Sequence, residues 1–164
     1  MNGELRSYRF SESVPMPGWF WAILLVGIGG VIAGMIAPLL DGARSWAWYA
    51  AYYPSMLVAL AVLVAAMGIF QRLRIAVTDE RVEFGFGILR RSLPLASIQS
   101  CEVKRYNWLP YGGWGIRFST GGRRAYSMPG VPRGVEITVA QGRKVRRYFV
   151  SSTQPERFAS SLSG

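Results

Sequence analysis

The chain has 164 residues, a net charge of +10, no histidine and a single cysteine, Cys101. This composition excludes a metal site of imidazole and thiolate ligands, a Ser-His-Asp triad, a Cys-His pair and an intramolecular disulfide. We therefore expect no enzyme activity and no cofactor, and we expect Cys101 to be a buried structural thiol.

The first part of the chain contains two long stretches without a charged side chain, at 19–40 and 46–70. At about 1.5 Å per residue, a helix of about 22 residues covers about 33 Å, which is enough to cross the hydrocarbon core of a bilayer. The first stretch is also too long for the apolar region of a signal peptide. We therefore predict a cytoplasmic segment over 1–17, a transmembrane helical hairpin over 18–70 and a cytoplasmic domain over 71–164.

Basic residues flank the predicted hairpin on its outer sides. Two precede it and three follow it closely, whereas Arg44 is alone in the connecting loop. The positive-inside rule then predicts a two-pass protein with both termini in the cytoplasm. Aromatic residues near the span ends are expected to be interfacial anchors, and they are Trp19, Trp21, Trp46, Trp48, Tyr52 and Tyr53.

Small residues suggest where the predicted helices pack. Gly30 and Gly34 stand four residues apart in the first span, a spacing that lets helix backbones approach closely. Two interpretations remain open: contact between the two helices of the hairpin, or docking against another membrane protein. Neither span contains a charged residue, which argues against an ion pathway or a transporter.

The remainder of the chain is typical of a β-rich domain. Short segments of alternating apolar and polar residues recur between residues 72 and 151, with turns at Asp79-Glu80, Gly121-Gly122 and Gln141-Gly142. We predict about seven strands followed by a C-terminal helix over 153–162. Thr153 and Glu156 fit a capping box at its start, and Phe158 and Leu162 share one face.

The order of these elements resembles the bacterial pleckstrin-homology-like (PH-like) domain family over roughly residues 70–163. The residues that carry the resemblance are 111–117 (YGGWGIR), 125–126 (AY), 134–137 (GVEI), 142–144 (GRK) and 152–158 (STQPERF). The resemblance implies an α+β protein, with a bent antiparallel β-sheet or barrel capped by one helix. It also implies a bacterial inner (cytoplasmic) membrane location, because members often carry membrane helices before the domain, and it implies no enzyme activity.

The positive charge indicates where partners bind. Residues 1–70 hold three basic and three acidic side chains, so the whole excess lies in the predicted domain. A phosphoinositide site at the first hairpin, as in eukaryotic relatives, is not favoured, because the turn there is Asp79-Glu80. Candidate residues for binding phosphates, acidic proteins or anionic lipid headgroups are Arg90, Arg91, Arg123, Arg124, Arg143, Lys144, Arg146 and Arg147, although a solvated outer face is the alternative.

Only Gln71 separates the second span from the first strand pattern, so the domain is expected to stay close to the membrane. Trp108, Tyr111 and Trp114 are expected either to pack in the core or to form a docking edge. We expect a membrane scaffold or accessory subunit that binds and stabilises a secretion, envelope, respiratory or photosynthetic complex. A membrane-pinned module that recognises anionic lipid headgroups is the alternative, and no nucleic-acid partner is expected.

Overall fold

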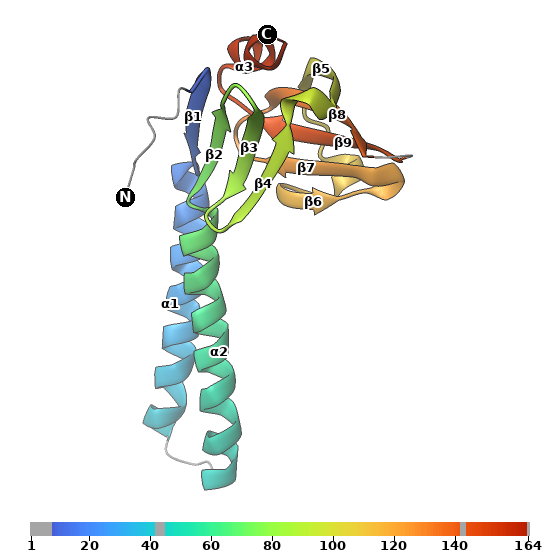
Figure 1. Cartoon of the computed structure of the whole chain (residues 1–164). Helices are drawn as coiled ribbons and strands as arrows, with labels where there is room; N and C mark the ends of the chain where they lie inside the picture. Colours follow the sequence, from blue (N-terminus) through green and yellow to red (C-terminus); the bar gives the residue numbers. More distant parts are fainter. Residues whose placement is uncertain (1–7, 42–44, 142–143, 164) are drawn as a thin grey trace, which may run out of the picture. The chain divides into compact units, whose positions relative to one another are not determined.

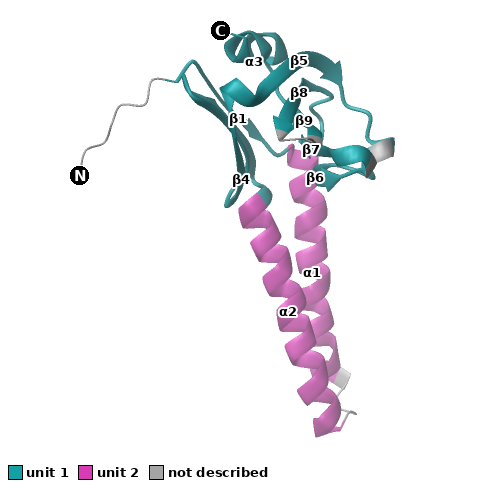
Figure 2. Cartoon of the chain, turned by 45° about the vertical axis from the view of Figure 1, so that its right-hand side comes forward, with its two compact units in different colours: residues 1–16, 70–164 teal, residues 17–69 magenta. Residues whose placement is uncertain are grey.

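The computed structural model describes residues 8–41, 45–141 and 144–163 of an α+β protein (Figure 1). Two long apolar helices, β-sheets and a short C-terminal helix make up the fold. The chain divides into two compact units, residues 17–69 and residues 1–16 with 70–164 (Figure 2). The unit that contains the sheets is therefore built from two separate pieces of sequence.

The helical unit consists of α1 (Gly18–Asp41) and α2 (Trp46–Phe70). Both helices are long and apolar enough to cross a membrane, by length and composition. Almost none of their residues is buried inside the protein, unlike the core helix of a soluble domain. Most of the apolar surface of the two helices is therefore exposed among the described residues.

The two helices pack along a narrow seam. Half-buried positions recur at alternating intervals of three and four residues, which is the repeat of a left-handed coiled coil. On α1 the seam contains Leu24, Ile28, Val31 and Met35, together with the buried Pro38, and on α2 it contains Tyr49, Tyr52, Met56, Ala59, Leu63 and Ala66.

A strand that the sequence did not predict precedes the hairpin. Strand β1 (Phe10–Pro15) pairs in antiparallel fashion with β2 (Arg72–Val77), from Phe10 opposite Val77 to Pro15 opposite Arg72. The backbone N–H of Met16 then donates to the carbonyl of Gln71 at 3.0 Å. Residues 10–15 of the predicted N-terminal segment are thus part of the sheet. The hairpin is inserted between two neighbouring strands of one sheet.

Two sheets form the second unit. The first has the order β1-β2-β3-β4, with β3 at Arg81–Phe86 and β4 at Leu89–Pro94. The second has the order β5-β8-β9-β7-β6. Its strands are β5 (Ile98–Arg105), β6 (Gly115–Phe118), β7 (Arg123–Ser127), β8 (Arg133–Gln141) and β9 (Lys144–Ser151). The described strand pairs are antiparallel except β7 with β9, which is parallel and departs from the predicted antiparallel sheet.

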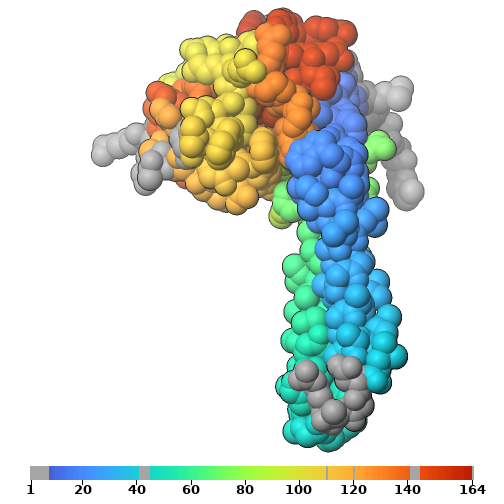
Figure 3. Space-filling model, turned by 180° about the vertical axis from the view of Figure 1, so that it is seen from behind, coloured from blue at the N-terminus to red at the C-terminus, as the bar shows by residue number. Residues whose placement is uncertain are grey.

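The core lies between the inner faces of the two sheets. The ring of Phe84 on β3 lies 4.9 Å from the ring of Tyr126 on β7 and 5.9 Å from that of Tyr148 on β9, centroid to centroid. Helix α3 (Pro155–Leu162) adds the buried Phe158, whose ring stacks on Phe10 of β1 at 5.4 Å. The N-terminal strand and the C-terminal helix therefore lie against each other, as the blue and red atoms show in Figure 3.

The predicted capping box at the start of α3 is wrong. The helix begins at Pro155 without a side-chain cap, and Glu156 forms an ion pair with Arg133 instead. The carboxylate of Glu12 on β1 accepts hydrogen bonds from the Thr153 N–H at 2.8 Å and from the hydroxyls of Ser152 and Thr153 at 2.5 Å. The N-terminal strand thereby holds the segment that leads into the helix.

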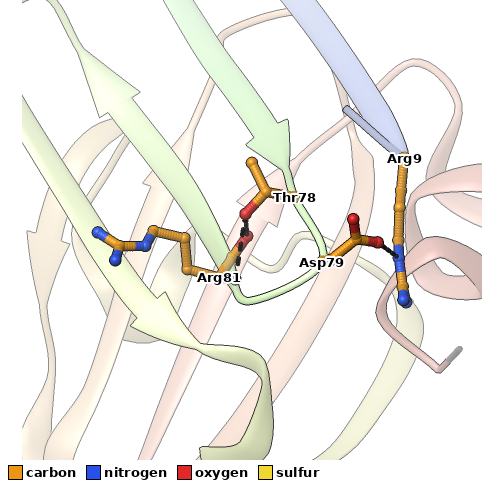
Figure 4. A network of polar contacts seen from close by, with 4 residues as sticks. All are labelled: Arg9, Thr78, Asp79 and Arg81. Carbon is orange, nitrogen blue, oxygen red and sulfur yellow. Dashed lines mark hydrogen bonds and ion pairs between the residues drawn. The ribbon is translucent and has the colours of Figure 1, made fainter. Parts of the chain in front are cut away.

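The predicted turn at Asp79-Glu80 is present between β2 and β3. The N–H of Thr78 donates to the carbonyl of Arg81 at 2.9 Å. The Thr78 hydroxyl donates to the same carbonyl at 3.2 Å, and Arg9 donates from Nε to the Asp79 carboxylate at 2.6 Å (Figure 4). The acidic turn therefore fixes the segment that leads into β1. Its Asp79 carboxylate is already occupied by a cation of the same chain.

Candidate functional site

The outward face of the four-stranded sheet carries a groove of about 450 Å³. The inward-pointing residues of β2 are buried, so Arg72 and Arg74 between them point to the outward face. The register places Ser13, Arg74, Gly85 and Arg90 in one row across the four strands. We call this surface the outer-face groove.

The outer-face groove is positively charged. Among the described residues, Arg72, Arg74 and Arg90 have no carboxylate within ion-pair distance, and the Nε of Arg90 donates to the carbonyl of Gly87 at 2.8 Å. Two acidic residues, Glu83 and Glu12, also line the groove, and the carboxylate of Glu12 is hydrogen-bonded to Ser152 and Thr153. Guanidinium groups bind phosphate oxygens through paired donors, so the groove suits a phosphate beside an ammonium or hydroxyl group.

Glycine at position 85 is required by the close approach of two strands. A Cβ there would lie 2.2 Å from the carbonyl oxygen of Leu89 and 2.7 Å from the Cα of Arg90, and its φ is +150°. Any side chain would therefore push β4 away from β3 and separate Arg90 from Arg74.

A second group of basic residues lies on the inner faces of the sheets. Arg91 pairs with Phe84 in the β3–β4 register, and Arg124 pairs with Tyr148 in the β7–β9 register. Both arginines are half-buried, and the guanidinium of Arg124 lies 5.1 Å from the ring centroid of Phe118 and 5.9 Å from that of Tyr148. The pKa of Tyr126 is raised above its ordinary value by burial, and the nearby charges of Arg124 and Arg91 offset part of this rise.

The other predicted basic residues lie on different surfaces. Arg123 and Arg147 are exposed neighbours in the β7–β9 register, and Arg146 stands opposite Val139, on the other face of β9. Arg143 and the side chain of Lys144 lie outside the part of the chain that the structure describes. The six predicted residues whose side chains the structure describes thus do not form one patch. Arg72 and Arg74 line the groove but were not among the predicted residues, although strand alternation already placed both on one face.

The two predicted glycines of α1 have different environments. A Cβ at Gly34 would lie 3.4 Å from the hydroxyl of Tyr52 on α2, whereas a Cβ at Gly30 would have no atom within 4 Å. Gly34 therefore belongs to the hairpin seam. Gly30 is on the outward surface, together with Ala33 and Ala37.

The tyrosines at the start of α2 contact α1. The hydroxyls of Tyr49, Tyr52 and Tyr53 donate to the backbone carbonyls of Pro38, Gly34 and Met35 at 3.0, 2.8 and 3.0 Å. Tyr52 and Tyr53 thus bind the neighbouring helix, and their role as interfacial anchors stays a prediction.

The predicted tryptophan anchors differ in exposure. Trp46 is 83% exposed and Trp19 is 50% exposed, whereas Trp21 is half-buried. Trp48 stacks on the ring of Tyr52 at 4.4 Å. Trp46 and Trp19 therefore fit an anchoring role best.

The aromatic cluster after β5 is on the surface. Trp108 and Trp114 are 52% and 45% exposed, their rings stack at 6.4 Å, and they line a pocket of about 580 Å³. Tyr111 is half-buried against Tyr106. The two tryptophans therefore fit the docking edge and not the core. The glycines that follow form a turn with positive φ at 112, 113 and 115, as expected for a tight entry into β6.

Comparison of the chain with protein-family models, curated proteins and solved structures finds no match. The resemblance to bacterial PH-like domains therefore stays a prediction. Function has to follow from the residues themselves: an uncovered apolar hairpin, a groove with three arginines and an exposed tryptophan pair.

Proposed function

We propose that this chain is a non-enzymatic, two-span protein of the bacterial inner membrane that serves as a scaffold or accessory subunit of a larger membrane complex, with a cytoplasmic PH-like domain. The observation that carries the proposal is the insertion of the hairpin between β1 and β2. Hydrogen-bonded neighbouring strands belong to the same side of a bilayer, so the N-terminal strand and the rest of the domain share one side. Only Met16 and Pro17 separate β1 from α1, and only Gln71 separates α2 from β2.

The charge distribution supports a cytoplasmic domain. The whole excess of +10 lies in residues 71–164, and Arg72 and Arg74 follow the end of α2 directly. Basic residues close to span ends favour the cytoplasmic side, and anionic lipids of the inner leaflet attract them.

The outward surface of the hairpin supports a protein partner within the membrane. Small residues at Gly30, Ala33 and Ala37 of α1 and at Ala61 and Ala65 of α2 are exposed. Such residues let a partner helix approach closely, because van der Waals packing drives helix association in lipid. The exposed pair Trp108 and Trp114 offers a second contact outside the membrane.

Extraction of the tagged chain from native membranes in mild detergent tests this proposal. The wild-type chain should co-purify with an integral-membrane protein, and Gly30→Leu should release it. Gly29→Leu is the matched control, because Gly29 is also in open space but lies about 100° away around the helix. If the partner co-purified equally with the wild type and with both variants, the surface around Gly30 would not be the contact.

The outer-face groove favours a second candidate function, recognition of anionic lipid headgroups. Two of its three arginines, Arg72 and Arg74, follow the last residue of α2 in the sequence after only Gln71. The full chain in nanodiscs of phosphatidylcholine should gain thermal stability when phosphatidylglycerol is added, and Arg74→Gln with Arg90→Gln should abolish the gain. Arg123→Gln removes an exposed charge of the other sheet and should leave the gain in thermal stability intact. If Arg123→Gln reduced this gain as much as the double variant does, the effect would be unspecific charge attraction.

A further inference from the structure

A group of aromatic and basic residues lies where the inner faces of β4, β7 and β9 meet. Phe84 stands between Tyr126 and Tyr148, and it pairs with Arg91 of β4. Arg124 reaches the same group from β7, with its guanidinium 5.9 Å from the ring centroid of Tyr148. We call Arg91, Arg124 and Tyr148 the inner cluster.

Two polar atoms of the inner cluster are buried without a hydrogen-bond partner. They are the Nε of Arg91 and the hydroxyl oxygen of Tyr148, whose residue is completely buried. Buried polar groups are almost always hydrogen-bonded in folded proteins, because losing water without a replacement costs free energy. Neither atom has a hydrogen-bond partner among the residues that the structure describes.

The charges of the inner cluster are also uncompensated. Within residues 8–41, 45–141 and 144–163, no carboxylate lies within ion-pair distance of Arg91 or Arg124. The guanidinium of Arg124 lies over the rings of Phe118 and Tyr148. Arg91 and Arg124 both act on the charge state of Tyr126, and two half-buried guanidinium groups without a counterion favour a bound anion.

We propose that the inner cluster binds an oxyanion of the phosphate type, supplied by a lipid headgroup or by free phosphate. The two guanidinium groups offer planar pairs of donors, and the Tyr148 hydroxyl offers one more, which matches the several acceptor oxygens of a phosphate. Both arginines remain partly exposed, so an anion can reach them from solvent. This site lies on the opposite face of β4 from the outer-face groove, because Arg90 and Arg91 alternate across that strand.

The alternation of side chains supplies a matched control. Arg123 and Arg124 are adjacent on β7 but point to opposite faces, and removing either changes the net charge equally. The full chain in phosphatidylcholine nanodiscs is titrated with inorganic phosphate while tryptophan fluorescence reports the melting temperature. Phosphate should raise that temperature, and Arg91→Gln and Arg124→Gln should each weaken the apparent affinity about tenfold, the loss expected for one charged hydrogen bond. Arg123→Gln should change it by less than about twofold.

Tyr148→Phe keeps the test decisive if an arginine variant fails to fold. Without phosphate this variant should be as stable as the wild type or more stable, because it removes an unsatisfied buried hydroxyl. It should nevertheless bind phosphate more weakly. Phenylglyoxal modification read by mass spectrometry should show Arg91 and Arg124 protected by phosphate.

The source of the anion is decided by a parallel arm with nanodiscs that contain phosphatidic acid and no free phosphate. If Arg91 and Arg124 are protected from phenylglyoxal only in the phosphatidic acid nanodiscs, the anion is a lipid headgroup. If they are protected only in phosphatidylcholine nanodiscs with inorganic phosphate, the anion is free phosphate. Absence of protection under both conditions would overturn the proposal. So would equal weakening by Arg123→Gln and Arg124→Gln.

Discussion

Tyr52 donates a hydrogen bond of 2.8 Å to the carbonyl oxygen of Gly34, and this is the carbonyl that the helix itself leaves without a donor. In a regular helix that oxygen accepts from the N–H four residues later, but residue 38 is proline and has no N–H. Tyr53 and Tyr49 donate to the neighbouring carbonyls of Met35 and Pro38. In lipid a free carbonyl costs several kcal/mol, so the hydrogen bond from Tyr52 suits a hairpin inside a membrane.

Tyr52→Phe should lower the stability of the hairpin by about 0.6–1.7 kcal/mol, the range for side-chain hydrogen bonds between membrane helices. The comparison variant is Pro38→Ala, in which the Gly34 carbonyl regains an N–H donor within the helix. In that variant, Tyr52→Phe should lower the free energy of unfolding by less than in the wild type. Unfolding of the full chain in mixed micelles measures both differences. An identical cost in both backgrounds would show that the hydroxyl does not replace the missing donor.

Glu12→Ala should destabilise the sheet domain by about 2–3 kcal/mol, since hydrogen bonds to charged groups contribute about 1.5–3 kcal/mol each and are not additive. The substitution leaves the Thr153 N–H and two hydroxyls without their acceptor. Ser11→Ala is the control and should be close to neutral, because Ser11 is exposed and alternates with Glu12 along β1. Denaturant unfolding of the full chain in detergent measures both, and equal effects would contradict the assigned role of Glu12.

Phe158→Ala should cost about 3–5 kcal/mol, as for other large-to-small changes of buried aromatic residues. Phe158 is completely buried and stacks on Phe10, so the loss also loosens β1. Arg157→Ala, at an exposed position of the same helix, should change stability little. A melting curve for Phe158→Ala that matches the wild type would rule out this packing.

We expect the Glu156–Arg133 pair to make the free energy of unfolding weakly dependent on pH in the acidic range. A hydrogen bond from its own backbone N–H and the Arg133 guanidinium lower the pKa of Glu156 below its ordinary value. Its contribution is therefore present above the unfolded-state pKa of about 4.3 and is lost as the pH falls through the lower folded-state pKa. Glu156→Gln should flatten that part of the stability profile; an unchanged acid profile would show that the pair does not contribute.

The sequence predicted the elements that have a strong local pattern. Val82, Phe84 and Phe86 alternate with polar residues, and β3 is found there. The two uninterrupted apolar stretches are α1 and α2. Each of these signals lies within a few residues, so neighbouring segments are not needed to interpret it.

The features that the sequence did not predict depend on distant partners. Strand β1 contains two serines and Glu12, and it becomes a strand through pairing with β2 beyond the hairpin. Thr153 fits a cap, but its hydroxyl binds Glu12. Alternation separates Arg123 from Arg124, but only the packing of the two sheets decides which of them faces the core.

The central claim, a membrane protein partner on the outward face of the hairpin, is tested most directly by crosslinking in native membranes. A photoreactive group is attached at Ala33→Cys, which is outward-facing, and at Ala66→Cys, which is in the seam, each in a Cys101→Ser background. The account predicts that position 33 yields an adduct with an integral-membrane protein, while position 66 reacts only within its own hairpin. Lipid adducts alone at position 33 would contradict the scaffold function.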